Sequence, residues 1–316
     1  MVSVGYFLSS EEFSPRELVR QARLAESAGF ERLWISDHFH PWLDEQGNSP
    51  FVWSVLGALS EVTSLPVSTA VTCPIVRLHP AVVAQAAATA AVQFDGRFVL
   101  GVGTGEALNE HVTGEQWPPP AVRLEMLEEA IHVIRELHTG KEVDHRGRYY
   151  TVDHARLYTL PDEPVPIYVS AFGPAAAGLA ARVGDGFCTV QPDADLVRKY
   201  REAGGGGKPV QGGLKVCWAE SEEDGVRTAH SRWRNELLPG KLPSTLPTPA
   251  DYAAASSLVT EEMVREQFPC GPDADRHVEA VREFAEAGFD EVYVQQIGPD
   301  QEKFFEAWRT QVLPRL

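Results

Sequence analysis

Short apolar runs alternate with segments of helical periodicity along most of the chain. The apolar runs have the length of strands and lie at residues 3–8, 32–36, 66–72, 98–100, 167–170, 187–190, 214–218 and 291–296. Runs of this kind, bounded by glycine and polar residues, are typical of strands buried in a parallel sheet. Amphipathic segments separate them, and the first begins with the helix-start signal Ser14-Pro15-Arg16-Glu17.

Eight strands that alternate with helices place the chain in the α/β class and predict a (β/α)8 TIM barrel. An open, doubly wound sheet is the alternative. Two segments interrupt the alternation: a hairpin predicted about Arg146-Gly147, and a proline-rich, irregular stretch. We therefore expect a single domain over residues 1–316, with insertions near 143–160 and 239–274.

Composition narrows the classes of partner. The chain of 316 residues has 28 basic and 45 acidic residues, a formal net charge of −17, which argues against nucleic acid and anionic membrane surfaces. Its four cysteines are widely spaced, as in proteins of reducing compartments. Neither a signal-peptide pattern nor a run of about 18 apolar residues is present. We expect a cytoplasmic protein that binds a small-molecule substrate.

The segment 97–110, RFVLGVGTGEALNE, is the strongest candidate for chemistry. Glycines at 101, 103 and 105 let the backbone approach another molecule closely, because they carry no Cβ atom. Glu106 follows at the carboxyl end of a predicted strand, where barrels keep their functional groups. The pattern lacks the third glycine of the dinucleotide fingerprint GxGxxG, so it does not predict a nicotinamide site.

His38 follows the second predicted strand and pairs naturally with Glu106 as an acid/base couple. Histidine titrates near neutral pH, and a glutamate in a dry pocket can have its pKa raised toward that range. Two other interpretations stay open: a packed structural histidine, and a metal site formed by Asp37, His38 and His40. Because no further ligands show the spacing of a barrel metal site, no metal is predicted, and His40 is assigned to a structural or rim position.

Five sequence blocks resemble the luciferase-like monooxygenase superfamily, and within it the coenzyme F420-dependent glucose-6-phosphate dehydrogenase group. They are SDHFHPW at 36–42, HPAVVAQAAAT at 79–89, GVGTGEALNE at 101–110, GDGF at 184–187 and LPRL at 313–316. The run HVTGEQWPP at 111–119 also resembles a sister branch associated with FMN. The resemblance implies a barrel, a homodimer, and a flavin-type ring, F420 or alternatively FMN, held over the strand ends.

The resemblance also implies roles for individual residues. His38 exchanges the substrate proton, Trp42 steadies the intermediate, and Glu106 moves a proton at the pyrimidine edge of the cofactor. Glu11 is assigned to substrate binding. The positions implied for the cofactor are Asp37, Cys73, Thr104, Gly105 and Asn109, a non-prolyl cis peptide at Ala70-Val71, and a phosphate seat at Phe172, Gly173, Ala175 and Ala176.

Two departures from the group's pattern sharpen the expected function. Phe172 stands where the group has the first of two glycines in its phosphate turn, and the stretch 244–268 contains no lysine that could hold a sugar phosphate. We expect hydride transfer between F420 and a small alcohol or carbonyl compound, and not glucose 6-phosphate. The alternatives are an FMN-dependent monooxygenase or reductase and, more remotely, a non-catalytic flavin-binding protein.

Overall fold

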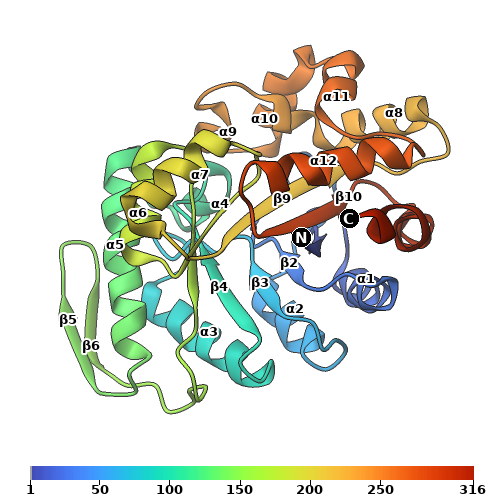
Figure 1. Cartoon of the computed structure of the whole chain (residues 1–316). Helices are drawn as coiled ribbons and strands as arrows, with labels where there is room; N and C mark the ends of the chain where they lie inside the picture. The colour runs from blue at the N-terminus through green and yellow to red at the C-terminus, as the bar shows by residue number, and fades with distance from the viewer. Residues whose placement is uncertain (1) are drawn as a thin grey trace.

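A closed barrel of parallel strands forms the centre of the molecule in the computed structural model, which describes residues 2–316 (Figure 1). Strand β1 pairs with both β2 and β10, so the sheet has no open edge and the barrel prediction is confirmed. The barrel strands are β1 (Ser3–Leu8), β2 (Leu33–Ile35), β3 (Val67–Thr69), β4 (Phe98–Val102), β7 (Ile167–Ser170), β8 (Gly186–Thr189), β9 (Val210–Val216) and β10 (Glu291–Gln296).

Helices cover the outside of the barrel (Figure 1). The principal ones are α1 (Pro15–Ala28), α2 (Val52–Leu59), α3 (Pro80–Gln93), α5 (Pro120–Leu137), α6 (Pro174–Val183), α7 (Ala194–Tyr200), α8 (Glu222–Trp233), α12 (Ala274–Glu286) and α13 (Gln301–Ala307). Helix α1 follows its sequence signals: the Ser14 hydroxyl caps the Glu17 N–H, and Gly29 ends the helix at a φ of 96°.

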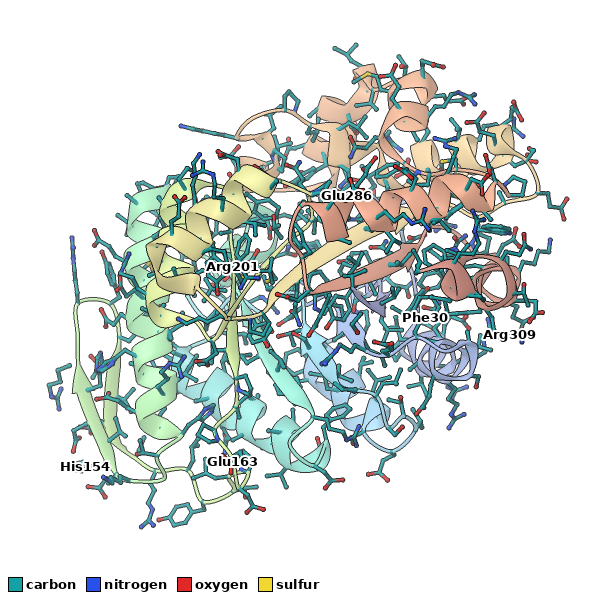
Figure 2. The ribbon with its side chains drawn as sticks, in the orientation of Figure 1. Phe30, His154, Glu163, Arg201, Glu286 and Arg309 are labelled. Carbon is teal, nitrogen blue, oxygen red and sulfur yellow. The ribbon has the colours of Figure 1, made fainter. Side chains whose placement is uncertain are left out.

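Aromatic side chains join the last helices to the first strand. Figure 2 shows Phe30 between α1 and the C-terminal helices. Its ring centroid lies 5.6 Å from that of Tyr6 on β1 and 5.9 Å from that of Trp308. None of the helices within residues 2–316 combines the length and the apolar character needed to cross a bilayer.

Two segments stand outside the alternation of barrel strands and helices. The first is the antiparallel hairpin of β5 (Val143–Arg146) and β6 (Thr151–Ala155), which stands beside α5 at the edge of the molecule (Figure 1). The second carries the short helices α9 (Leu242–Thr245), α10 (Pro249–Ala255) and α11 (Glu261–Gln267). Helix α9 packs on α4 (Ala107–Glu110), the short helix after β4, so this insertion reaches the carboxyl ends of the strands.

The seventh barrel strand begins earlier than predicted, at Val210 rather than at Leu214. The hydrophobic pattern does not predict the first residues of this strand, because they include Gly212 and Gly213, which do not count as apolar. A Cβ atom on Gly212 would lie 2.4 Å from Cδ1 of Phe284, and one on Gly213 would lie 3.0 Å from the Trp34 ring. The strand therefore uses glycine because neighbouring aromatic rings press against its backbone.

Candidate active site

A cavity of about 710 Å³ opens at the carboxyl ends of the strands. One side, which we call the strand wall, is formed by the ends of β1, β2, β3, β4, β7 and β8 and the loops that follow them. The opposite side, which we call the insertion wall, is formed by lining residues between Trp233 and Tyr252. Chemistry in a TIM barrel is found at this end of the strands.

His38 and Glu11 form a close ion pair in the strand wall. His38 Nδ1 lies 2.6 Å from Glu11 Oε1, and the two side chains are 13% and 2% exposed. The other carboxylate oxygen of Glu11 accepts hydrogen bonds of 2.9 Å from the hydroxyls of Ser9 and Ser36. Glu11 is thereby fixed in place, and His38 Nε2 is the ring nitrogen left for a molecule in the cavity.

The two members of this pair shift each other's pKa. Burial alone would raise the pKa of Glu11, but the charge and hydrogen bond of His38 lower it to about 2. Burial would lower the pKa of His38, but the negative charge of Glu11 raises it. The Glu11 carboxylate therefore stabilises the protonated imidazole of His38. A histidine that accepts a proton during a reaction is converted to this form.

Glu106 has the opposite character. Burial raises the pKa of its carboxyl, against the charge of His38, a hydrogen bond from Asn109 and the charge of Arg123. Gly105 positions it with a φ of +67°, and a Cβ at Gly105 would lie 2.9 Å from Glu110 Cγ and 3.1 Å from Cys73 Sγ. The cavity thus holds an ionised carboxylate, Glu11, behind a histidine, and a second carboxyl, Glu106, that is biased toward its neutral form.

Small and apolar residues shape the strand wall into a seat for a flat ring. The Ala70-Val71 peptide is cis, as the resemblance implied. A Cβ atom on Gly103 would lie 2.7 Å from Val71 Cγ2, so the loops after β3 and β4 are in close contact there. Phe7, Trp34 and Cys188 line the same wall. A planar heteroaromatic group fits this surface, which offers apolar area and backbone groups but little charge.

The predicted phosphate seat lies in the turn after β7. Phe172, Gly173, Ala175 and Ala176 all line the cavity, at the start of the ten-residue helix α6. The first N–H groups of a helix have no partner within it and attract anions. An added Cβ at Gly173 meets no atom within 4 Å, so the space beside this turn is open. The residues present therefore fit a phosphate-bearing flavin-type cofactor.

Two residues expected at the cofactor lie behind the cavity instead of lining it. Asp37 accepts hydrogen bonds from Thr72 (2.7 Å) and Arg77 (2.9 Å). Asn109 Oδ1 accepts from the N–H groups of Phe39 (2.9 Å) and His40 (3.1 Å). Through these contacts the two side chains hold the loops after β2 and β4 together, and the cofactor contacts implied at both positions stay predictions.

The other predicted site residues line the cavity, and two of them, Glu11 and Trp42, also make contacts within the protein. Glu11 was assigned to substrate, but its oxygens are occupied by His38, Ser9 and Ser36. Trp42 stands between the walls, with its ring centroid 5.0 Å from that of His38 and 5.1 Å from that of Tyr252. The predicted residues that line the cavity are His38, Trp42, Glu106, Ala70, Val71, Cys73, Thr104, Gly105, Phe172, Gly173, Ala175, Ala176 and Glu11.

The rival metal site at Asp37, His38 and His40 does not form within residues 2–316, where no metal-binding group includes these three residues. The reason is that each side chain has its own partner. Asp37 bonds Thr72 and Arg77, His38 pairs with Glu11, and His40 Nδ1 lies 3.0 Å from the carbonyl oxygen of Leu108. The bond to Leu108 supports the structural or rim position predicted for His40, which stays a prediction.

Two cations in the cavity were missed by sequence reasoning. Lys215 on β9 lies 2.6 Å from Glu236 Oε1 and 4.5 Å from the centre of the Trp233 ring. Arg123 donates a 2.9 Å hydrogen bond to the Pro118 carbonyl and lies 4.3 Å over the Trp117 ring. A lysine inside the apolar run Leu214-Lys215-Val216 was the available signal.

Comparisons with known proteins agree with this geometry. A family model described as luciferase-like monooxygenase matches residues 2–291. The chain is 35% identical, over 99% of its length and 96% of the relative, to an F420-dependent glucose-6-phosphate dehydrogenase of Microbacterium testaceum. A relative of the same description from Mycobacterium avium is 36% identical over 100% of this chain and 98% of the relative.

A solved structure resembles the chain closely as well. It is described as an F420-dependent secondary alcohol dehydrogenase in complex with an F420–acetone adduct, and matches with a TM-score of 0.93 and 33% identity over 99% of this chain and 98% of that one. The F420-dependent tetrahydromethanopterin reductase of Methanopyrus kandleri shares the fold at 23% identity and a TM-score of 0.77, over 99% of each chain.

Proposed function

Because the chain belongs to the luciferase-like monooxygenase family, we propose that it is a coenzyme F420-dependent oxidoreductase acting on a small, uncharged secondary alcohol or its ketone. The observation that carries the proposal is the pairing of His38 with Glu11 in one cavity with Glu106. This arrangement provides one proton acceptor and one proton donor, as the interconversion of an alcohol and a carbonyl compound requires. The similar F420-dependent relatives support the choice of cofactor.

The cofactor residues follow from the strand wall. Ala70, Val71 and Gly103 would contact the ring, and the N–H groups of Ala175 and Ala176 would face the phosphate. Bound F420 supplies a ring carbon that accepts or gives a hydride. The apolar strand wall excludes water from that surface, so that proton exchange is left to the side chains around it.

His38 accepts the hydroxyl proton of an alcohol at Nε2, or returns it to a ketone in the reverse direction. The ionised Glu11 carboxylate, 2.6 Å from Nδ1, stabilises the imidazolium that forms. Trp42 packs edge-on against the imidazole, with an interplanar angle of 88°, and restricts the orientation of the ring. Glu11 thus acts through His38 rather than on the substrate itself.

Burial raises the pKa of the Glu106 carboxyl and so favours its protonated form. A neutral carboxyl can donate a hydrogen bond, or the proton itself, to negative charge that develops on a bound ring. The separate environments of Glu11 and Glu106 therefore assign them opposite tasks. Glu11 stays ionised behind the histidine, and Glu106 is the proton donor on the cofactor side.

The insertion wall argues for an uncharged substrate. Its surface includes Trp233, Leu238, Pro243 and Tyr252, and the nearby Lys215 is neutralised by Glu236 at 2.6 Å. Phosphate sites depend on free Lys or Arg charge. A sugar phosphate would therefore have to bind without a free ammonium group at this position, although relatives described as glucose-6-phosphate dehydrogenases share about a third of the sequence.

The test combines a cofactor titration with a comparison of substrates. We expect F420 to bind, and 2-propanol to reduce it with a kcat/KM at least tenfold above that for glucose 6-phosphate, whose value should stay below about 10⁴ M⁻¹s⁻¹. Binding of FMN with no affinity for F420 would favour the FMN-dependent monooxygenase or reductase. Binding of either cofactor without turnover on any alcohol or ketone would favour a non-catalytic carrier.

A further inference from the structure

A group of imidazole and carboxylate side chains lies outside the cavity, where the β5–β6 hairpin meets α5. His132 and Glu136 stand one turn apart on α5, and His145 projects from β5 against them. Each residue offers one ligand atom, and these atoms all lie within 4.8 Å of one another. The proposed oxidoreductase chemistry uses none of the three residues.

The two separations between the imidazoles and the Glu136 carboxylate, one to each of its oxygens, are close to those between neighbouring ligand atoms of a tetrahedral metal ion. Zinc bonds to imidazole nitrogen and carboxylate oxygen of about 2.0–2.1 Å place neighbouring ligand atoms about 3.3–3.4 Å apart in a tetrahedron. His132 Nε2 lies 3.3 Å from Glu136 Oε1, and His145 Nδ1 lies 3.6 Å from Glu136 Oε2. Small rotations of these side chains would therefore suffice to complete three of the four positions.

The neighbours of His145 determine which of its ring nitrogens faces His132 and Glu136. His145 Nε2 lies 3.2 Å from Glu129 Oε1, so Nε2 carries the hydrogen that this carboxylate accepts. Glu129 is itself held by the N–H groups of Arg148 (3.1 Å) and Tyr150 (2.9 Å). A carboxylate that orients the far nitrogen of an imidazole is the usual outer partner of a metal-binding histidine.

This tautomer leaves two lone pairs facing each other. His145 Nδ1 and Glu136 Oε2 are 3.6 Å apart, which is too long for a hydrogen bond. A metal ion placed between Nδ1 and Oε2 would bind both atoms. The arginines nearby do not fill that position, because Arg135 pairs with Asp185 at 2.9 Å and Arg148 pairs with Glu125 at 2.6 Å.

We propose that His132, Glu136 and His145 bind one zinc ion, with water in the fourth position. The side chain of His145 is 14% exposed, whereas those of His132 and Glu136 are 64% and 40% exposed, so the ion has a route of entry from solvent. Two of the ligands belong to α5 and one to the hairpin. Zinc therefore fastens the hairpin to the body of the protein.

Titration calorimetry of the chelator-treated full chain with zinc chloride tests the site. We expect one zinc ion per chain with micromolar or tighter affinity, and a rise of roughly 3–5 °C in the thermal midpoint at a hundredfold excess over Kd. His145→Gln and His132→Gln should each weaken zinc binding at least tenfold. Circular dichroism of each variant establishes that it has folded.

His154→Gln is the matched control on the same hairpin. His154 belongs to a second, exposed group of possible metal ligands with Glu142 and Asp144, so its replacement tests whether zinc binds there instead, and Figure 2 shows it at the outer edge of the molecule. This variant should bind zinc like the unchanged protein. The proposal is overturned if His154→Gln abolishes binding while His145→Gln preserves it, or if zinc does not bind and the imidazoles are simply protonated.

Limited proteolysis gives a readout that separates fastening from adventitious binding. Arg146 and Arg148 lie at the hairpin tip with side chains 73% and 71% exposed, and each is a trypsin site. Cleavage requires the hairpin to open locally. Zinc should slow cleavage at these two arginines at least tenfold, and His145→Gln should remove the protection. Equal cleavage rates with and without zinc would overturn the fastening role.

Discussion

The two walls of the cavity are built in different ways. The strand wall combines small residues and backbone with the rings of Phe7 and Trp34 and the His38–Glu11 pair, and at Gly103 it leaves no room for a methyl group. The insertion wall combines apolar and aromatic side chains with the polar side chains of Asn235 and Ser244 and with the Lys215–Glu236 ion pair. The difference indicates that the strand wall sets the reaction, whereas the insertion wall sets the substrate, so that each can change without the other.

His38 lies where the two walls meet, and its removal should have the largest effect. His38→Ala should lower kcat by about 10²–10⁴, because a positioned acid or base contributes that much. Affinity for the cofactor should change little, since the ring contacts belong to β3 and β4. Stopped-flow measurement of F420 reduction, together with a cofactor titration, checks both parts.

His40→Gln is the matched control, because His40 lies on the same loop but bonds only to the Leu108 carbonyl through its ring. We expect this variant to keep most of its activity. If His38→Ala retains near-native kcat, or loses the cofactor instead, His38 is a structural residue and the proposed proton transfer fails.

The buried carboxyl of Glu110, close to the strand wall, should make the stability of the protein depend on pH. Burial raises the pKa of Glu110 to about 7, against the hydrogen bond and charge of Arg77. The folded protein therefore holds a proton between about pH 4.5 and 7 that the unfolded chain releases, so the free energy of unfolding falls as pH rises through that window. For a shift of this size the loss is roughly 3 kcal/mol.

Glu110→Gln should remove this loss. Its amide oxygen can still accept from the Arg77 N–H, which now lies 2.8 Å from Glu110 Oε2. Urea unfolding at pH 5 and pH 8 should show a variant that gains stability, relative to the unchanged protein, only at the higher pH. Glu286→Gln, on the outer surface in Figure 2, should show no such gain. An equal difference at both pH values would contradict the prediction.

Gly103→Ala tests the close fit of the strand wall. The added methyl group would lie 2.7 Å from Val71 Cγ2, and overpacking of this kind costs about 1–3 kcal/mol. Because Val71 lines the ring seat, we expect cofactor affinity to fall about tenfold to a hundredfold, with a smaller change in KM for the alcohol. Gly178→Ala on α6, where a Cβ meets nothing within 4 Å, should leave affinity unchanged.

Sequence patterns located the strand wall because its parts are local. The run around Gly101 and Glu106 combines a buried strand, a glycine loop and a carboxylate within a few residues, and the structure places all three together. The roles of Asp37 and Asn109 could not be derived in the same way. Their partners Thr72, Arg77 and the loop N–H groups come from other strands, and only the closed barrel brings them into contact.

The insertion wall escaped prediction for a different reason. Apart from a short helix-like piece near 250–258, residues 239–274 have neither helical nor strand periodicity, and the wall forms by packing against distant elements. Glu12 shows this most clearly. It follows β1 beside Glu11, yet it accepts a 2.6 Å hydrogen bond from Trp233 and a 3.0 Å bond from the Gly298 N–H. Adjacent glutamates thus serve different walls, which no local pattern distinguishes.

The smallest expected effect is also the sharpest test of the insertion wall. Glu236→Gln removes the charge that neutralises Lys215, 2.6 Å away, while keeping the size of the side chain. A freed ammonium group should raise kcat/KM for glucose 6-phosphate about tenfold, equivalent to about 1.4 kcal/mol. The gain should be no larger, because the pair is close to solvent, which weakens the attraction between an ammonium group and a phosphate. The kcat/KM for an uncharged alcohol should stay within about twofold of its present value.

Glu45→Gln, which breaks the more exposed pair with Arg234 at 3.0 Å, is the matched control and should leave kcat/KM unchanged for both substrates. If Glu236→Gln lowers activity on both substrates equally, Lys215 supports the fold of the insertion wall and does not face the substrate.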